Sequence, residues 1–377
     1  MTKDYEGLSR RQFMYLGAGT AVAAMAGLAA CKKEEPAPTP EPAPAPEPAP
    51  EPAPTTQIIT DHGGDKVEVP LTINKICDLW HAHNQIVLML GGGDKLVGTT
   101  DNFKKRKWAN VVYPRLKDVE VLVIGTGAGE VNYEETMKLE PDVVFASAAS
   151  VVEGCRQYGL ACLNVSFQDY DGLRSNVNIT GKVLGGEAEK RAADWKEYLD
   201  KNIALVEERM KDVPKENRPR VLHIGNNSKL TTVDGLKCIV DEWINLAGGQ
   251  NALPFEGNLK ETTMEELVKA DPDIIIVPGG GKVADAITTI TTDPAWSGMK
   301  AVREGKVYAN PSGVFAWDRY SGEEALQILW AAKFFNPDKF ADIDMVKEVR
   351  DFYKKFYGAD ITEAQANRML QGLDPED

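Results

Sequence analysis

The sequence YEETMKLEPDVV at residues 133–144 returns in modified form as MEELVKADPDII at residues 264–275. The copies align without a gap at a constant offset of 131 positions, and six positions are identical or exchange one acid for another. Each copy predicts a short helix, a turn where proline ends that helix, and a buried strand. The offset is longer than solenoid repeats, so the sequence predicts one architectural unit used once in each of two lobes. The alternative is a generic helix–turn–strand pattern that arose separately in each half.

Apolar runs bounded by Gly, Pro or Asp alternate with helical patterns around both copies, which is typical of βα units and a largely parallel sheet. The predicted strands are 75–79, 95–98, 142–146 and 162–165 in a first half, and 221–224, 273–277 and 306–308 in a second. Between the halves, residues 173–210 lack proline and predict one long helix, with a break near Gly185 and Gly186. We expect an α/β fold of two Rossmann-like lobes with mostly parallel sheets, joined by one long rigid helix, with a ligand cleft between the lobes.

The first 56 residues have a different composition from the rest. Ten of the 22 prolines lie between Pro36 and Pro54, alternating with Ala, Glu and Thr, which is typical of a solvated polyproline II spacer. Before them, SRRQFM at residues 9–14 opens an uncharged apolar run that is too short to span a membrane and ends in LAAC at residues 28–31. The paired arginines resemble a twin-arginine export signal, and LAAC resembles the lipobox of bacterial lipoproteins. This resemblance implies cleavage before Cys31, lipid on its sulfur, and a mature protein anchored outside the cytoplasm.

These observations predict the organisation of the whole chain, whose 377 residues suffice for two ordinary domains. The expected parts are a signal at 1–31, a disordered tether at 32–56, an N-terminal lobe at 57–170, a connecting helix at 171–212 and a C-terminal lobe at 213–377. A net charge of −14 argues against a nucleic-acid partner. Five cysteines without CxxC spacing exclude a disulfide scaffold and a zinc ribbon. Cys155 and Cys162, or Cys77 or Cys238 with another partner, remain able to form a disulfide after export.

Three segments together resemble the solute-binding proteins of ABC importers for iron-siderophore complexes, haem and cobalamin. They are NKICDL at 74–79, LGGGDKLVGTTD at 90–101, and NYEE at 132–135 leading to PDVV at 141–144. The resemblance extends over about residues 58–357. It implies a monomer that holds a ligand between its lobes, requires no cofactor, is not an enzyme, and delivers the ligand to a permease with ATPase subunits. It also implies that Glu134 and Glu265, one in each lobe, dock on the permease; the alternative is a solvated carboxylate that the helix dipole favours.

Loops that follow the carboxyl ends of parallel strands are the expected ligand contacts. The first loop is WHAHN, with Trp80, His81, His83 and Asn84 as candidates. On a strand, His81 and His83 face the same side and are able to ligate a metal. The alternative is that both rings form hydrogen bonds to the backbone or to oxygen atoms of the ligand.

The second loop, residues 101–108, is the densest basic cluster of this acidic chain. We expect Lys104 and Lys105 to be solvated, whereas Arg106 and Trp108 suit an anionic, partly apolar chelate. The glycines of GTGAGE at 125–130 do not match a dinucleotide-binding fingerprint, and we expect Gly127 to bring backbone amides near the ligand.

The second half contributes four further candidates, which are His223, Asn226, Trp317 and Arg319. The sequence WDR at 317–319 resembles a motif of family members that bind metal chelates or molybdate. An equal alternative is the start of a helix, with Asp318 or Ser321 as its cap.

The expected ligand is a chelated metal, with a ferric siderophore first and haem, cobalamin, molybdate or tungstate as alternatives. Basic and imidazole-bearing loops favour an anionic ligand, and the tryptophans at 80, 108, 296 and 317 favour a bulky one. Two alternatives from other classes are an exported metalloenzyme that uses His81, His83 and His223, and a surface adhesion module. The sequence contains neither HExxH nor GxSxG, which argues against the enzyme.

Overall fold

The computed structural model describes residues 54–376. The predicted signal, with its lipobox Cys31, and the predicted tether as far as residue 53 lie outside the described residues. Within the described part, no helix has both the length and the apolar character needed to cross a membrane.

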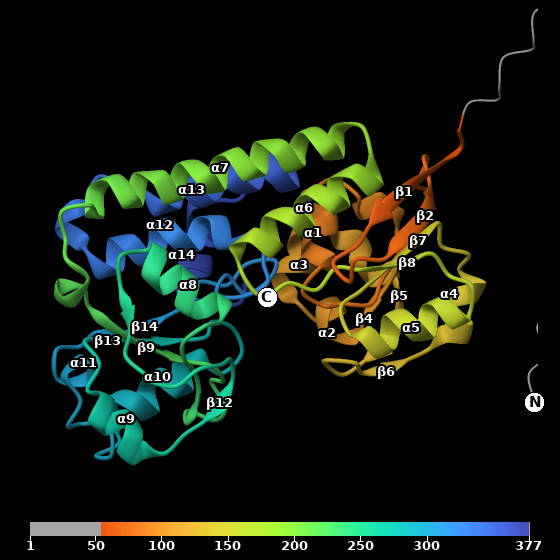
Figure 1. Ribbon diagram of the computed structural model, residues 1–377. Helices are drawn as coiled ribbons and strands as arrows, with labels where there is room; N and C mark the ends of the chain where they lie inside the picture. Colours follow the sequence, from red (N-terminus) through yellow and green to blue (C-terminus); the bar gives the residue numbers. More distant parts are fainter. Residues whose placement is uncertain (1–53, 377) are drawn as a thin grey trace, which may run out of the picture. The chain divides into compact units, whose positions relative to one another are not determined.

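The first half of the chain forms one mostly parallel sheet (Figure 1). Its strand order is β6-β5-β4-β3-β7-β8. Only the β5–β6 pair is antiparallel among its neighbouring strands, and the central strands β3 and β7 are buried throughout, as expected for parallel strands covered on both faces. The strands are β3 (Ile76–Asp78), β4 (Leu96–Thr100), β5 (Glu120–Ile124), β6 (Glu130–Val131), β7 (Val143–Ala146) and β8 (Cys162–Asn164). The helices are α1 (Asn84–Met89), α2 (Asp101–Lys104), α3 (Lys107–Val112), α4 (Tyr133–Lys138) and α5 (Ala149–Gln157). A separate antiparallel hairpin, β1 (Thr56–Thr60) and β2 (Lys66–Pro70), precedes this sheet.

The second half forms a mixed sheet with strand order β12-β10-β9-β13-β14, in which β11 also pairs with β9. Strands β9, β11, β13 and β14 are parallel, whereas β10 and β12 are antiparallel to their neighbours. The strands are β9 (Arg220–Ile224), β10 (Thr232–Asp234), β11 (Gln250–Asn251), β12 (Lys260–Glu261), β13 (Ile274–Val277) and β14 (Val307–Ala309). The helices are α8 (Ile239–Leu246), α9 (Met264–Ala270), α10 (Val283–Thr292) and α11 (Lys300–Arg303).

The repeated sequence forms the same unit in each half, as predicted. Helix α4 and strand β7 correspond to α9 and β13 at the offset of the repeat. The acid before each proline, Glu140 or Asp271, has a positive φ, of 49° and 37°. The aspartate after each proline, Asp142 or Asp273, accepts the backbone N–H at the start of its sheet's first strand, at 2.9 Å and 2.8 Å. The same local arrangement therefore joins the helix to the sheet in both halves.

The connection between the halves is broken at Gly185 and Gly186, as predicted, but the break reverses the chain instead of interrupting one long helix. Helices α6 (Tyr170–Leu184) and α7 (Glu187–Met210) form an antiparallel hairpin, because Gly185 and Gly186 both have positive φ, of 70° and 56°, and reverse the chain. The hairpin is held by an ion pair between Arg174 of α6 and Asp200 of α7, at 2.9 Å. Helix α7 alone is therefore the long connecting helix.

The remainder of the chain packs against both halves. Its helices are α12 (Glu324–Phe335), α13 (Met345–Phe352), a π-helical turn at Tyr353–Tyr357, and α14 (Glu363–Leu370). Short 3-10 turns occur at Gly93–Lys95, Pro114–Asp118, Lys215–Asn217 and Pro337–Lys339. The indole of Trp195 in α7 donates to the Gly322 carbonyl at 2.8 Å, and the Tyr357 hydroxyl donates to Gln85 of α1 at 3.2 Å. One continuous apolar core runs through both halves and this final segment, and each half also has a separate apolar cluster of its own.

Candidate functional site

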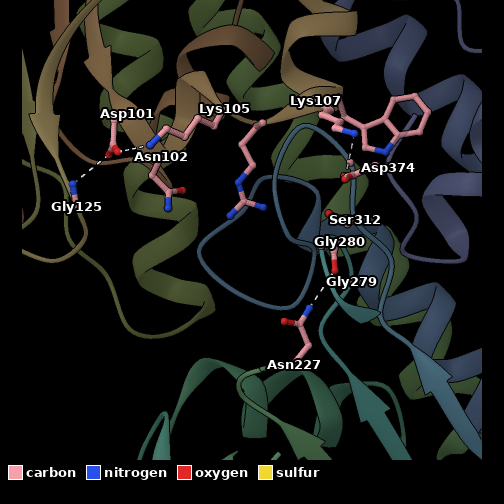
Figure 2. Close-up of a pocket in the computed structure, with 14 residues that line it drawn as sticks. Asp101, Asn102, Lys105, Lys107, Gly125, Asn227, Gly279, Gly280, Ser312 and Asp374 are labelled. Atoms are coloured by element: carbon pink, nitrogen blue, oxygen red, sulfur yellow. Dashed lines mark hydrogen bonds and ion pairs between the residues drawn. The ribbon is translucent and has the colours of Figure 1, made fainter. Parts of the chain in front are cut away.

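The carboxyl ends of both sheets open onto one cavity of about 410 Å³ (Figure 2). The first half contributes the loops after β4 and β5, and the second half contributes the loops after β9, β13 and β14. The lining residues are Asp101, Asn102, Lys105, Arg106, Lys107, Trp108, Gly125, Asn227, Gly279, Gly280, Gly281, Ser312, Gly313 and Asp374. The predicted cleft between the lobes therefore has a definite lining, with basic side chains on one side and glycine-rich backbone on the other.

The basic loop is fixed at the start of α2. Thr100 caps this helix by accepting the N–H of Phe103 at 3.1 Å. The Asp101 carboxylate accepts both the Gly125 N–H at 3.0 Å and the Lys105 ammonium at 2.6 Å, and the bond from Lys105 is the main cause that lowers the pKa of Asp101. Asp101 thus joins the loops after β4 and β5 and neutralises Lys105.

Arg106 presents a different electrostatic situation. Its guanidinium carbon lies 4.4 Å from the ring centre of Phe315, a residue of the second half. Within residues 54–376, no hydrogen-bond or ion-pair partner is found for the guanidinium. Burial lowers the pKa of Arg106, although the carboxylates of Asp318, Asp374 and Glu323 act to raise it. A guanidinium that is desolvated, stacked on an aromatic ring and without a direct counter-ion favours an anion in the cavity beside it.

Glu323 supports the ring on which Arg106 stacks. This carboxylate is fully buried and accepts the backbone N–H of Phe315 at 2.8 Å and the hydroxyl of Tyr353. Burial raises the pKa of Glu323 to about 7, and its hydrogen bonds only partly oppose this effect. Phe315 is therefore held by a carboxyl group that titrates near neutral pH.

The first predicted loop does not form the expected histidine pair. His81 is half-buried with its ring 5.7 Å from that of Phe315, and burial, aided by Arg106, lowers the pKa of His81 to about 4. His83 is completely buried, with Nδ1 2.7 Å from Asp78 and Nε2 2.9 Å from Thr180. The two rings face different surroundings because this segment is the turn into α1 rather than a strand. The prediction that His81 and His83 bind one metal is thus wrong for this structure.

Two other residues of that loop are also used internally. The Asn84 amide donates to the carbonyls of Asp78 and Trp80, at 3.1 Å and 2.9 Å, and its oxygen accepts the hydroxyl of Thr99. Trp80 is 8% exposed and packs against Phe167. Both residues therefore stabilise the loop and do not line the cavity.

His223 and Arg319 meet in a buried charge network. His223 lies between Asp234, at 2.8 Å, and Asp318, at 3.3 Å, and Arg319 forms ion pairs with the same two carboxylates. Burial acts to lower the pKa of His223, but the hydrogen bonds and charges of the two aspartates outweigh it and raise the pKa. Trp317, which precedes Asp318 in the sequence, is fully buried. These three residues do not line the cavity, and His223 and Arg319 pair with the two aspartates, so their role as ligand contacts stays a prediction.

The three histidines of the metalloenzyme alternative are therefore held by separate sets of partners. Among the described residues, no group of three or more His, Cys, Asp or Glu side chains is arranged to hold a metal ion.

For three predicted contacts, either a nearby residue lines the cavity instead or the predicted side chain is oriented differently from what we expect. Trp108 lines the cavity, but it is 2% exposed and its indole N–H donates to the Leu373 carbonyl at 2.9 Å. Asn227 lines the cavity, whereas the Asn226 side chain caps the N–H of Ser228. Gly125 lines it in place of the predicted Gly127.

Some lining residues escape the sequence reasoning. The glycines at 279–281 follow β13, at the same sheet edge as the predicted loops, and the run PGGG after an apolar strand was a usable signal. Asp374 also lines the cavity, and Phe315 contacts the Arg106 guanidinium; both lie far along the chain, and no local pattern marks them.

The two predicted docking residues lie at equivalent places. Glu134 and Glu265 are exposed in the first turns of α4 and α9, which are capped by Asn132 and Thr263. The helix dipole favours a carboxylate there, so both readings of these residues are compatible with the structure.

The predicted disulfide partners lie close together. Among the described residues, Cys77, Cys155, Cys162 and Cys238 are free thiols. Cys155 and Cys162 are buried, and their mutual hydrogen bond lowers the pKa of Cys155. The disulfide stays a prediction.

Comparison with known proteins identifies a family and relatives that this chain resembles. Residues 81–313 match the family described as periplasmic binding protein. The molybdate-binding protein MolA of Haemophilus influenzae is 28% identical over 329 residues, which cover 80% of this chain and 91% of that protein. The Fe(3+)-citrate-binding protein YfmC of Bacillus subtilis is 25% identical over 237 residues, covering 60% of this chain and 69% of that protein.

Solved structures share the fold over most of its length. A periplasmic solute binding protein from Veillonella parvula matches with a TM-score of 0.73 and 27% identity, covering 84% of this chain and 97% of that chain. MolA bound to molybdate matches with a TM-score of 0.72 and 24% identity, covering 81% of this chain and 99% of that chain. The family resemblance in the sequence is confirmed, and the chain belongs to the periplasmic binding protein family.

Proposed function

We propose that this protein is the extracytoplasmic solute-binding subunit of an ABC importer, and that its ligand is a small anionic metal species, with molybdate or tungstate first. The observation that carries the proposal is the guanidinium of Arg106, which lines the cavity without a counter-ion within the described residues. A tetrahedral oxyanion would accept hydrogen bonds from this guanidinium and from backbone N–H groups of the glycine loops. The relative named as molybdate-binding, at 28% identity, supports the same ligand class.

The size and lining of the cavity support a small ligand over a bulky one. A volume of about 410 Å³ is near the lower end of typical ligand pockets. The tryptophans at 80, 108, 296 and 317, which favoured a bulky ligand, are all at most 8% exposed. Haem and cobalamin thereby lose their support. A ferric siderophore, the first ligand predicted from the sequence, becomes the second candidate, supported by the relative named as Fe(3+)-citrate-binding.

Titration calorimetry tests the ligand class directly. The protein is titrated with molybdate, tungstate, a ferric siderophore, ferric citrate, haem and cobalamin, and we expect heat from the two oxyanions. Arg106→Gln should weaken oxyanion binding by about ten- to a hundredfold, because a charge-assisted hydrogen bond is lost. Arg115→Gln is the matched control, since Arg115 is exposed and pairs with Asp94 outside the cavity. Equal affinities for both variants, or heat only from the iron ligands, would contradict the oxyanion assignment.

Delivery and anchoring complete the proposal. Glu134 and Glu265 would present one carboxylate from each lobe to basic residues of the permease, which steers and registers the encounter. Lipid on Cys31 would hold the protein at the membrane, in line with relatives named as lipoproteins. Metabolic labelling with palmitate should mark the wild-type protein and not Cys31→Ser. Label retained by the variant would refute the anchor.

A further inference from the structure

The segment Gly372, Leu373 and Asp374 crosses between the two halves at the cavity. The Leu373 carbonyl accepts the indole N–H of Trp108 at 2.9 Å, and the Gly372 carbonyl accepts the N–H of Gly280 at 2.6 Å. Gly372 has a φ of 66°, and a β-carbon there would lie only 3.0 Å from the Cα of Gly279. The segment is therefore fixed by close backbone packing on one half and by a hydrogen bond from the other.

This segment adds a second carboxylate to a cavity that Asp101, Lys105, Arg106 and Lys107 also line. Asp374 lines the cavity, and its carboxylate lies 3.9 Å from the ammonium of Lys107 (Figure 2). Its backbone carbonyl accepts the guanidinium of Arg368 at 2.8 Å. Its charge is also one of those that act to raise the pKa of Arg106. Asp374 thus lies close to the basic side chains that would attract an anionic ligand.

The charged residues of the lining determine how Asp374 affects an incoming anion. The lining contains three basic residues, Lys105, Arg106 and Lys107, and two acidic ones, Asp101 and Asp374. Asp101 accepts a hydrogen bond from Lys105. A negative charge at Asp374 repels an incoming anion, and the energy of this repulsion grows in proportion to the charge of the anion. Resting on the anionic ligand proposed above, we propose that Asp374 is an internal counter-anion that sets the ligand charge the cleft accepts.

The test uses two anions of the same shape and different charge. Tungstate and perrhenate are both tetrahedral tetraoxo anions, with two negative charges and one, respectively. In Asp374→Asn, calorimetry at low ionic strength should show about tenfold tighter tungstate binding and only about threefold tighter perrhenate binding, since the Coulomb energy scales with charge. Glu376→Gln is the matched control: it removes the same charge two residues later, from a carboxylate that is 81% exposed and pairs with Arg368 outside the cavity. The control should change either affinity by less than twofold.

Each outcome decides the proposal. A larger gain for tungstate than for perrhenate supports it, and so does tungstate binding by Asp374→Asn when the wild type binds none. Equal gains for both anions would show that Asp374 acts through the fold of the segment and would overturn it. Wild-type binding with no gain over Glu376→Gln would overturn this inference and leave the proposed function intact. Absence of binding in the wild type and in Asp374→Asn would refute both.

Discussion

Glu323→Gln should remove a specific part of the pH dependence of stability. Burial raises the pKa of Glu323 from 4.5 to about 7 in the folded protein. Between these two pH values the folded state keeps a proton that the unfolded state has lost, so unfolding releases a proton and stability falls as pH rises. The difference in pKa corresponds to a loss of roughly 3 kcal/mol of folding stability. This loss is absent below about pH 4.5 and complete above about pH 7.

Urea denaturation at pH 5 and at pH 8, followed by tryptophan fluorescence, measures this loss. The wild type should lose roughly 3 kcal/mol more than Glu323→Gln across this interval, because the other titrating groups are common to both proteins. The variant should also carry a pH-independent cost of about 1–3 kcal/mol, since one amide oxygen replaces two carboxylate oxygens that accept from Phe315 and Tyr353.

Glu207→Gln is the control for the removal of a carboxyl group, because Glu207 is exposed on α7. This control should keep the wild-type pH dependence. If Glu323→Gln keeps it as well, Glu323 is ionised at both pH values and the argument from burial is wrong.

Three further predictions address packing, the connecting helix and delivery. Gly98→Ala should destabilise the first sheet by about 1–3 kcal/mol in urea melts, because the added carbon would lie 2.8 Å from the Cys77 sulfur and even closer to Leu122; an unchanged midpoint would show that this sheet relaxes freely. Trp195→Phe should cost about 1–3 kcal/mol, because it leaves the buried Gly322 carbonyl without the indole N–H of α7, and a neutral result would mean that water replaces this bond. Glu134→Lys with Glu265→Lys should abolish ligand uptake by cells while calorimetric affinity is unchanged, whereas a loss of affinity would assign the two residues a structural role.

The fold was largely predictable because its central strands are buried on both faces. Such strands are short apolar runs between breakers, and the repeat fixed the equivalence of β7 and β13 without any tertiary information. The helical hairpin was not predicted, because Gly185 and Gly186 are consistent with a break and do not by themselves state its angle. Their positive φ values determine the reversal.

The candidate site was predicted less well, for reasons that concern partners distant in sequence. The place of Arg106 in the cavity lining was predictable because the residue stands in a basic loop after a strand. His83 was misassigned because its partner Thr180 lies 97 positions away, so nothing local indicates that both ring nitrogens are occupied. Asp374 was missed because the bond between Trp108 and Leu373, which fixes its segment, spans 265 positions.

The continuous apolar core has a consequence for how this chain folds. Buried residues from both sheets, from α7 and from the final helices belong to one cluster, which includes Phe145, Trp195, Trp243 and Phe352. Either half made alone would leave its share of that surface in water, and this exposure opposes independent stability. Each lobe also has an apolar cluster of its own, so the shared cluster is what couples the two lobes, and a destabilised lobe should lower the stability of the other.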